Sequence, residues 1–293
     1  MMSRMISVQN LAAGEYYSVC CDVKRGLVWA AQERILECHA LRGLLAETAV
    51  VGYIGKVGGA YGGGVLAVNG FGRAARWSLK GKSVCRDWDL FEGDSLKSVG
   101  EVVETEGSLA ILVGVTGGCY SLVDVDGGAI GPAIELCAGA AAPVLSVVGR
   151  GEFGGALVAA ATLEGARLFR LERGGGVRPL CDVPVMFLSG VSALSEEVAV
   201  VAGGVRGELV VGVSVRSGEI LWEFVRDGVG VSRSVVAASG KVAVVVGDGV
   251  VVLDGGGRVC CALSMECVWD VSWMGARRLL VVGMKGMFLA EIP

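Results

Sequence analysis

The chain contains few residues whose type and spacing could do chemistry. His39 is the only histidine, and the ten cysteines form no CxxC pair. A structural zinc site needs four thiolate or imidazole ligands at matched spacings, so this pattern argues against zinc. Imidazole-assisted nucleophilic catalysis would have to use His39, but the adjacent Cys38 should point to the other face of the same apparent strand. We therefore expect His39 to be a solvent-facing or hydrogen-bonded structural residue.

The cysteine pattern favours packing over catalysis. The vicinal pairs Cys20-Cys21 and Cys260-Cys261 lie in apparent strands, where neighbouring side chains point to opposite faces and cannot easily share one metal. We interpret most cysteines as buried thiols that pack as small hydrophobic side chains. One or two disulfides are the alternative, which inside a cell would indicate a hyperthermophile. The cysteines considered for such disulfides are Cys20, Cys21, Cys260, Cys261 and Cys267.

Neither the carboxylates nor the glycine-rich segments indicate an active site. Glu196-Glu197 and the pair Asp87 and Asp89 lie beside turns or outer strands, where solvated charge explains them. The segment GGAYGGGVLAVNGFG lacks a GxxxxGK[ST] pattern and is not followed by a helix that could bind an anion. We therefore predict no enzymatic activity, no bound cofactor and no metal.

Composition limits the class of protein and its partners. Hydrophobic residues make up 53% of the chain, charged residues 19%, and the mean hydropathy is +0.62. The long uncharged segments are interrupted by glycine and proline, so we expect no transmembrane span. A net charge of -4 without a basic run disfavours nucleic acid as a partner. The N-terminus shows no signal peptide, which predicts a cytoplasmic protein, and the scarcity of Asn and Gln suggests a thermophilic source.

A hairpin recurs along the whole chain. Each copy is an apolar run, a short turn and a second alternating run, and the copies start near residues 26, 64, 109, 155, 198, 242 and 279. Six of the turns contain a glycine, at Gly72, Gly117, Gly165, Gly207, Gly249 and Gly286, and the first turn has Gln32-Glu33-Arg34 instead. The turns lie roughly 37 to 48 residues apart, which is typical of four-stranded propeller blades.

These repeats predict an all-β, seven-bladed β-propeller of four-stranded antiparallel blades that forms a single domain over residues 1–293. A β-sandwich is the alternative. The expected blades are 12–48, 49–92, 93–138, 139–184, 185–227, 228–264 and 265–293 plus 5–11. The last blade lacks an outer strand, which the segment 5–11 is free to supply. Such a closure would remove an exposed blade edge and leave a monomeric ring.

One segment resembles a known repeat family. In VRSGEILWEF, 215–224, a turn at Ser217-Gly218 precedes a strand carrying Trp222. This resembles the pyrroloquinoline-quinone-type propeller repeat, in which the tryptophan packs between blades. Cys261 falls near the same place in the next repeat. The resemblance implies the fold but no cofactor, because no cofactor motif surrounds either vicinal cysteine pair.

The WD-repeat family is the second comparison. The dipeptide Trp-Asp occurs at residues 88–89 and 269–270. Blades of that family also use a Gly-His pair, which a chain with His39 alone cannot repeat, and Trp269 falls on a first strand rather than at the end of a third. The chain therefore resembles the broad quinoprotein-like and WD-repeat-like propeller group as a divergent member.

The expected function is a non-catalytic scaffold that binds a protein partner, as a subunit of a larger complex. The expected contacts are the hairpin-tip residues Arg73, Arg206, Asp248 and Lys285. Trp269 and Trp273 are considered as aromatic anchors, with packing in the core as the stronger interpretation. The alternative is a small-molecule sensor or enzyme that uses the central channel, which would need charges such as Asp22 and Asp270 to converge there.

Overall fold

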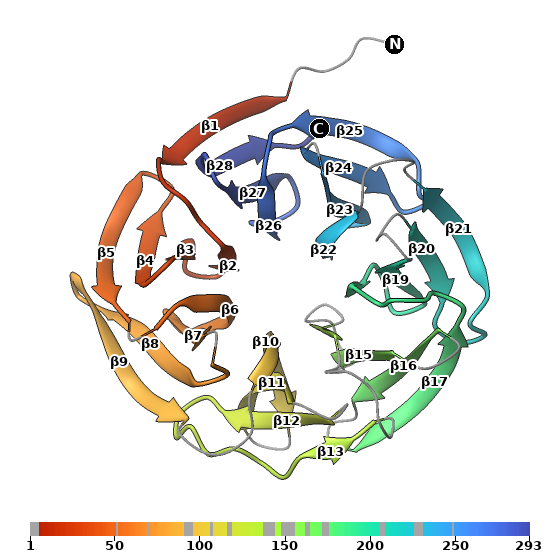
Figure 1. The fold of residues 1–293 in the computed structure, drawn as a ribbon, viewed down its shortest axis with the longest axis horizontal. Helices are drawn as coiled ribbons and strands as arrows, with labels where there is room; N and C mark the ends of the chain where they lie inside the picture. Colours follow the sequence, from red (N-terminus) through yellow and green to blue (C-terminus); the bar gives the residue numbers. More distant parts are fainter. Residues whose placement is uncertain are drawn as a thin grey trace.

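The fold is a closed ring of seven β-sheets (Figure 1). The computed structural model describes residues 6–50, 52–69, 71–90, 96–105, 108–115, 119–136, 144–147, 156–161, 165–171, 176–204, 209–225, 231–247 and 249–293. Each sheet has four antiparallel strands, and the described residues contain no helix. The predicted seven-bladed β-propeller is therefore confirmed, and the β-sandwich alternative is wrong.

The first four blades follow one another along the chain. The first contains β2 (Ser18–Asp22), β3 (Leu27–Gln32), β4 (Ile35–Ala40) and β5 (Gly43–Ala49). The second contains β6 (Ile54–Tyr61), β7 (Gly64–Asn69), β8 (Ala74–Lys80) and β9 (Ser83–Leu90). The third contains β10 (Leu96–Thr105), β11 (Ser108–Val115), β12 (Cys119–Asp124) and β13 (Ile134–Glu135). The fourth contains β14 (Val144–Val147), β15 (Ala156–Ala161), β16 (Ala166–Leu171) and β17 (Val177–Val183).

The last three blades bring the chain back to its beginning. The fifth contains β18 (Gly190–Ala193), β19 (Val198–Gly203), β20 (Leu209–Ser214) and β21 (Ile220–Val225). The sixth contains β22 (Val231–Ala238), β23 (Lys241–Val246), β24 (Gly249–Asp254) and β25 (Val259–Ser264). The seventh contains β26 (Val268–Trp273), β27 (Arg278–Gly283), β28 (Gly286–Glu291) and, from the other end of the chain, β1 (Ser7–Ala12).

The ring closes through this N-terminal strand. β1 pairs antiparallel with β28, with Ser7 opposite Glu291 and Asn10 opposite Phe288. Pairing occupies the backbone N–H and C=O groups along the edge of β28, which would otherwise be open to another chain. The predicted closure is therefore confirmed.

The hydrophobic core lies between the blades rather than within one sheet. The described residues form seven clusters of buried side chains, one at each junction between neighbouring blades. At the junction of the first and second blades, for example, Trp29 and Leu36 pack with Ile54. The strands are rich in valine, which suits a pleated surface buried on both faces.

The antiparallel order gives the ring two different faces. The turns between second and third strands lie at the same end as the connections from each outer strand to the next inner strand, and we call this end the tip face. The opposite face carries the turns from first to second and from third to fourth strands. Strands β2, β6, β10, β22 and β26 lie nearest the centre in Figure 1.

The tip turns contain glycine where a positive φ is needed. Gly72, Gly165, Gly249 and Gly286 have φ values of 78°, 155°, 144° and 140°, which confirms the prediction at these turns. Gly117 and Gly207 lie outside the described residues. The first turn has no glycine, as its sequence indicated.

At three junctions in the described part of the chain, a side chain of the outer strand packs against the next blade. Trp222 of β21 packs on Gly257, where an added Cβ would lie 2.6 Å from its ring, and its Nε1 donates to the Gly255 carbonyl at 2.9 Å. Trp88 of β9 has the same relation to Gly128, and Cys181 of β17 to Gly218. The predicted role of Trp222 as a wedge between blades is confirmed.

These side chains occupy one position in the blade. Trp88, Cys181, Trp222 and Cys261 each stand beside a register shift in the pairing between third and fourth strands. The expected equivalence of Cys261 and Trp222 is therefore confirmed. Two cysteines take the place of the tryptophan, which explains part of the high cysteine count as packing.

Replacing the wedge should cost stability in proportion to its burial. We expect Trp222→Ala to lower the free energy of unfolding by about 2 kcal/mol, less than for a fully buried tryptophan because Trp222 is only half-buried. Leu221→Ala is the matched control, since this neighbouring side chain is 50% exposed, and it should cost less than about 0.5 kcal/mol. Urea unfolding measures both, and equal losses would contradict the wedge.

Candidate interaction surface

His39 belongs to a buried hydrogen-bond network in the first blade. Its Nε2 lies 2.6 Å from Oε2 of Glu37, and the Tyr16 hydroxyl donates to the same oxygen at 2.8 Å. Gln32 donates to Oε1 of Glu37 at 2.7 Å. Burial, with the hydrogen bond to Glu37, raises the pKa of Tyr16. Cys38 packs in the cluster on the other face of β4, so a hydrogen-bonded structural His39 and its divergence from Cys38 are confirmed.

Asp270 ties three blades together near the tip face. Its Oδ2 accepts hydrogen bonds from Ser18 Oγ at 2.8 Å, Val19 N at 3.2 Å and Lys56 Nζ at 2.9 Å. Ser18 Oγ in turn accepts from Val57 N at 3.2 Å. The innermost strands β26, β2 and β6 are thus connected by one carboxylate, and Asp270 is only 3% exposed.

Asp22 has a separate structural role at the opposite face. Its Oδ2 accepts from the backbone N–H of Gly63 in the second blade at 2.9 Å, and its Oδ1 from Arg25 N at 3.3 Å. The side chain is 2% exposed. The sequence-based hypothesis that Asp22 and Asp270 converge in the channel is therefore wrong, because they lie at different ends of their strands and their oxygens serve contacts between blades.

The cysteines show the alternation expected of strands. Cys20 packs against the cluster between the first and second blades, and Cys21 against the cluster on the other side of β2. Cys260, Cys261 and Cys267 are free thiols, so no disulfide joins these three. Burial raises the pKa of Cys38 to about 12, which keeps this thiol protonated and unreactive.

The described residues contain neither a cluster of metal ligands nor a membrane-spanning helix. No group of three or more His, Cys, Asp or Glu side chains there is placed to hold a metal ion. Within the same residues, no helix has the length and hydropathy needed to cross a membrane.

Two of the four predicted rim residues, Arg73 and Lys285, are among the described residues, and both lie at hairpin tips. Arg73 is exposed at the tip between β7 and β8. Lys285 is exposed at the tip between β27 and β28, where its Nζ lies 2.7 Å from Glu266 Oε2. This contact raises the pKa of Lys285 and lowers that of Glu266. Arg206 and Asp248 lie outside the described residues.

Three aromatic side chains meet at the tip-face end of the inner strands. Tyr17 stacks on Trp269 with ring centroids 4.5 Å apart and an interplanar angle of 11°. Tyr53 meets Tyr17 edge to face, with centroids 4.9 Å apart. We call Tyr17, Tyr53 and Trp269 the aromatic patch. It combines side chains from the first, second and seventh blades, and Tyr53 is 39% exposed.

The two candidate anchors separate in the structure. Trp273 is 8% exposed, packs with the core between the sixth and seventh blades, and donates from Nε1 to the Val236 carbonyl at 3.0 Å. Packing in the core is therefore its role, and it is not an exposed anchor. Trp269 differs because the pairing of β26 shifts between Val268 and Asp270, which takes Trp269 out of the regular alternation.

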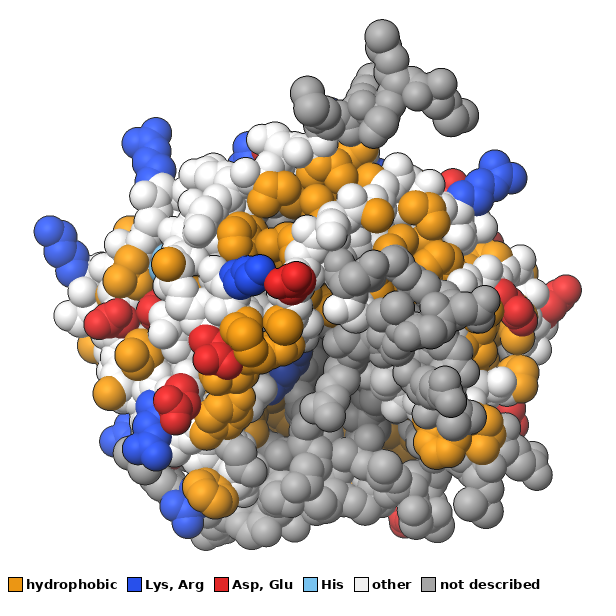
Figure 2. Space-filling model, turned by 45° about the horizontal axis from the view of Figure 1, so that its top comes forward, with side chains coloured by type: hydrophobic (Ala, Val, Ile, Leu, Met, Phe, Trp, Pro, Cys, Tyr) orange, Lys and Arg blue, Asp and Glu red, His pale blue; other side chains and the backbone are white. Residues whose placement is uncertain are grey.

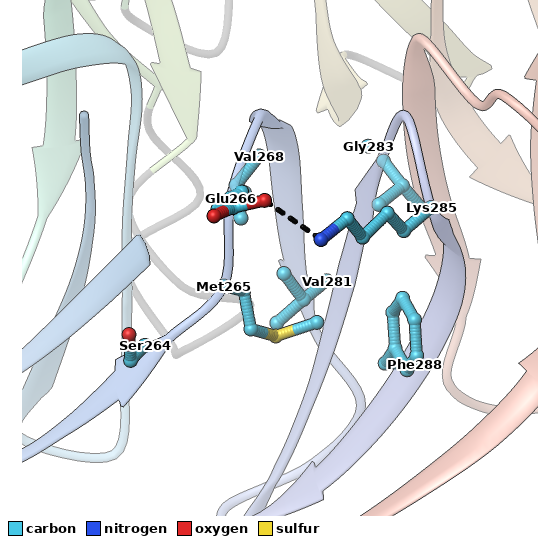
Figure 3. A pocket seen from close by; sticks show the side chains of 9 residues that line it. Ser264, Met265, Glu266, Val268, Val281, Gly283, Lys285 and Phe288 are labelled. Carbon is cyan, nitrogen blue, oxygen red and sulfur yellow. Dashed lines mark hydrogen bonds and ion pairs between the residues drawn. The ribbon is translucent and has the colours of Figure 1, made fainter. Parts of the chain in front are cut away.

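A pocket lies on the seventh blade (Figure 3), and one of its lining residues, Val268, directly precedes Trp269 of the aromatic patch. The pocket has a volume of about 340 Å³. Its lining combines apolar side chains such as Met265, Val281 and Phe288 with the polar side chains of Ser264, Glu266 and Lys285. The ion pair between Glu266 and Lys285 forms part of this lining. A pocket that combines apolar lining with a few polar and charged groups is the arrangement that receives a side chain of a ligand or partner.

Further exposed apolar side chains lie on the tip face. Phe71 is 79% exposed at a hairpin tip, Met284 is 52% exposed beside the pocket, and Phe187 is 63% exposed before β18. Figure 2 shows hydrophobic side chains in several groups on the face that it draws, with basic and acidic side chains between them. Exposed apolar groups edged by charge are typical of binding surfaces.

Sequence reasoning missed most of this surface. The predicted contacts do not include Tyr17, Tyr53 or Phe71, although each lies in a connection or hairpin tip at one end of the ring. The sequence does contain a signal for these residues. A large aromatic side chain in a loop has no neighbouring strand to bury it, so it is a candidate contact residue. The predicted rim contacts are all charged residues of the hairpin tips.

The fold and this surface define the class of the protein as a seven-bladed β-propeller with an apolar, aromatic tip face. No protein-family model matches the sequence, and no curated protein matches it. Solved structures do match over nearly the whole chain.

Three of the similar structures illustrate the likeness. The U3-55K structure has a TM-score of 0.75 at 9% identity, covering 97% of this chain and 98% of that one. BamB from Moraxella catarrhalis has a TM-score of 0.64 at 14% identity, with 98% and 97% covered. BBS1N in complex with ARL6DN has a TM-score of 0.71 at 14% identity, with 98% and 95% covered. At these identities the likeness shows the fold alone.

Proposed function

We propose that the protein is a non-catalytic scaffold that binds a protein partner through its tip face, as a subunit of a larger complex in the cytoplasm. The observation that carries the proposal is the pocket beside the aromatic patch. Val268 lines the pocket, and the next residue, Trp269, belongs to the patch. A pocket with several apolar lining residues, close to aromatic rings that are only partly buried, resembles the composition of a protein-binding hot spot.

Two further observations support the proposal. One of the similar propellers, BBS1N, is in complex with ARL6DN, so a ring of this shape can carry a partner. The two carboxylates that a channel site would need, Asp22 and Asp270, are buried and hydrogen-bonded between blades. A sensor or enzyme in the channel is therefore not the function we propose.

A pair of triple variants tests which face binds. The tip-face variant combines Met284→Glu and Lys285→Glu, which place negative charge beside the pocket, with Arg73→Glu at the tip of the second blade. The control combines Lys24→Glu, Lys82→Glu and Val23→Glu at exposed positions in turns of the opposite face. Both make the same change in formal charge, and both should keep the free energy of unfolding within about 1 kcal/mol of the unchanged chain.

The measurement is affinity purification from the source cells with mass spectrometry, using the unchanged chain and both variants as bait. We expect a stoichiometric protein that the control retains and the tip-face variant loses at least about tenfold. Loss with the control variant instead would place the interface on the opposite face. A copurified small molecule without any protein would contradict the scaffold and favour a channel ligand.

A further inference from the structure

We propose that the aromatic patch binds an arginine side chain of the partner protein, with its guanidinium lying on the rings and held by Glu15 and Glu33. This inference rests on the proposed function and adds the chemistry of one contact. Glu15 lies just before β2 and Glu33 in the tip between β3 and β4, so both are on the tip face. Both side chains are exposed.

The patch presents aromatic surface that the ring does not fully bury. Tyr17 and Trp269 are half-buried, and Tyr53 is exposed. Next to them along the inner strands, the hydrogen bonds of Asp270 with Ser18 and Lys56 already connect the three blades. The rings therefore remain accessible at a place where other contacts hold the inner strands together.

Two carboxylates lie near the patch. Glu15 is two residues before Tyr17, and the backbone carbonyl of Glu33 accepts from the N–H of Ile54, the residue after Tyr53, at 2.8 Å. Partial burial raises the pKa of Tyr17 to about 12, with further contributions from a hydrogen bond to Glu15 and from the charge of Glu33. Burial also raises the pKa of Tyr53, and the charges that add to it are again Glu15 and Glu33. The nearby cation Lys56 is paired with Asp270. Among the described residues no salt bridge involves Glu15 or Glu33, so their negative charge is open to a partner.

The shape of the patch favours a guanidinium over an ammonium group. Tyr17 and Trp269 touch face to face at 4.5 Å, which leaves no gap between the rings for a tetrahedral cation. A planar guanidinium can stack on the outer surface of such rings and donate several N–H groups to carboxylates. Lysine or methylated lysine would gain less, because a compact ammonium needs rings arranged around it.

Selection from a peptide library tests the proposal with the whole chain. The immobilised protein is presented with a phage-displayed library of random dodecapeptides, and the enriched peptides are synthesised and measured by fluorescence anisotropy. The patch variants are Tyr53→Ala and the double variant Glu15→Gln with Glu33→Gln. The matched control is Glu47→Gln with Glu223→Gln, which removes two carboxylates from the outer strands β5 and β21.

The expected result is a set of peptides that share an arginine. Their affinity should fall about tenfold on the double patch variant and on Tyr53→Ala, while the control pair leaves it unchanged. Replacing the peptide arginine by lysine should weaken binding about threefold or more. Urea unfolding of the variants, within about 0.5 kcal/mol of the unchanged chain, shows that folding is not the cause.

Other results would overturn the arginine site, and they also show whether the proposed scaffold function still holds. Peptides without arginine that lose affinity on the tip-face triple variant would reject the arginine site and support the scaffold. If no tip-face variant changes the affinity of the peptides or the recovery of the cellular partner, both the arginine site and the tip-face scaffold are rejected. No enrichment, or a dimer of the chain that dissociates on Tyr53→Ala, would also overturn the arginine site.

Discussion

Asp270→Ala should lower the free energy of unfolding by about 3 kcal/mol. The substitution leaves the Ser18 hydroxyl and the Val19 N–H without an acceptor between the blades, and buried donors without a partner are costly. The loss of the ion pair itself should contribute little, because the Lys56 side chain is 44% exposed and can turn to water. Most of the cost therefore comes from the unpaired buried groups where the ring closes.

The measurement is urea unfolding with linear extrapolation, set against a surface carboxylate. Asp182→Ala breaks an ion pair with Arg167 in which the two side chains are 66% and 44% exposed, and it should cost less than about 0.5 kcal/mol. Asp270→Asn keeps one side-chain oxygen and the shape of the side chain. Its loss of unfolding free energy should therefore lie between the losses of Asp270→Ala and Asp182→Ala. If Asp270→Ala were as mild as Asp182→Ala, the carboxylate would not be what connects the three blades.

Gly249→Ala should be the most damaging single substitution proposed, costing about 4 kcal/mol or more. Gly249 opens β24 with a φ of 144°, which L side chains rarely adopt. An added Cβ would lie 1.9 Å from the carbonyl oxygen of Leu263 in the outer strand β25. Relief requires β25 to move away from β24, which disturbs both the blade and its junction with the seventh blade.

Two other glycines separate the backbone cost from the clash. Gly275→Ala introduces a methyl group at a φ of 80° with nothing within 4 Å, so it should cost only about 1 kcal/mol. Gly286→Ala would bring Cβ to 2.5 Å from the Ala12 carbonyl and should lie between them. Thermal and urea unfolding rank the three variants, and an equal cost for Gly249→Ala and Gly275→Ala would show that approach of the outer strand is unimportant.

The outer-strand position of Trp222 shows which features a local sequence pattern can predict and which it cannot. The turn before Trp222 and its role as a wedge could be predicted, because turn and strand are neighbours in the chain. The same role for Trp88 and Cys181 was missed, since their flanking sequences do not repeat the motif. Only the register shift shared by these outer strands reveals that they occupy equivalent places.

The candidate site was predictable only in outline. Hairpin-tip charges such as Arg73 and Lys285 were correctly placed at one end of the ring, because turns are marked by local residue types. Trp269 and Trp273 looked equivalent in sequence, four residues apart on one strand. A shift in the pairing of β26 separates them, so that Trp269 is half-buried and Trp273 is buried.

By itself the sequence determined the strands, their turns, the number of blades and the closure of the ring. Alternation of apolar residues and the turn glycines are local features, and their spacing repeats along the chain. The tertiary structure alone decided which side chains meet at the centre. Asp270 and Ser18 are 252 residues apart in sequence, and they touch because a circular arrangement brings the first and last inner strands together. Such contacts depend on the geometry of the closed ring, which no local pattern encodes.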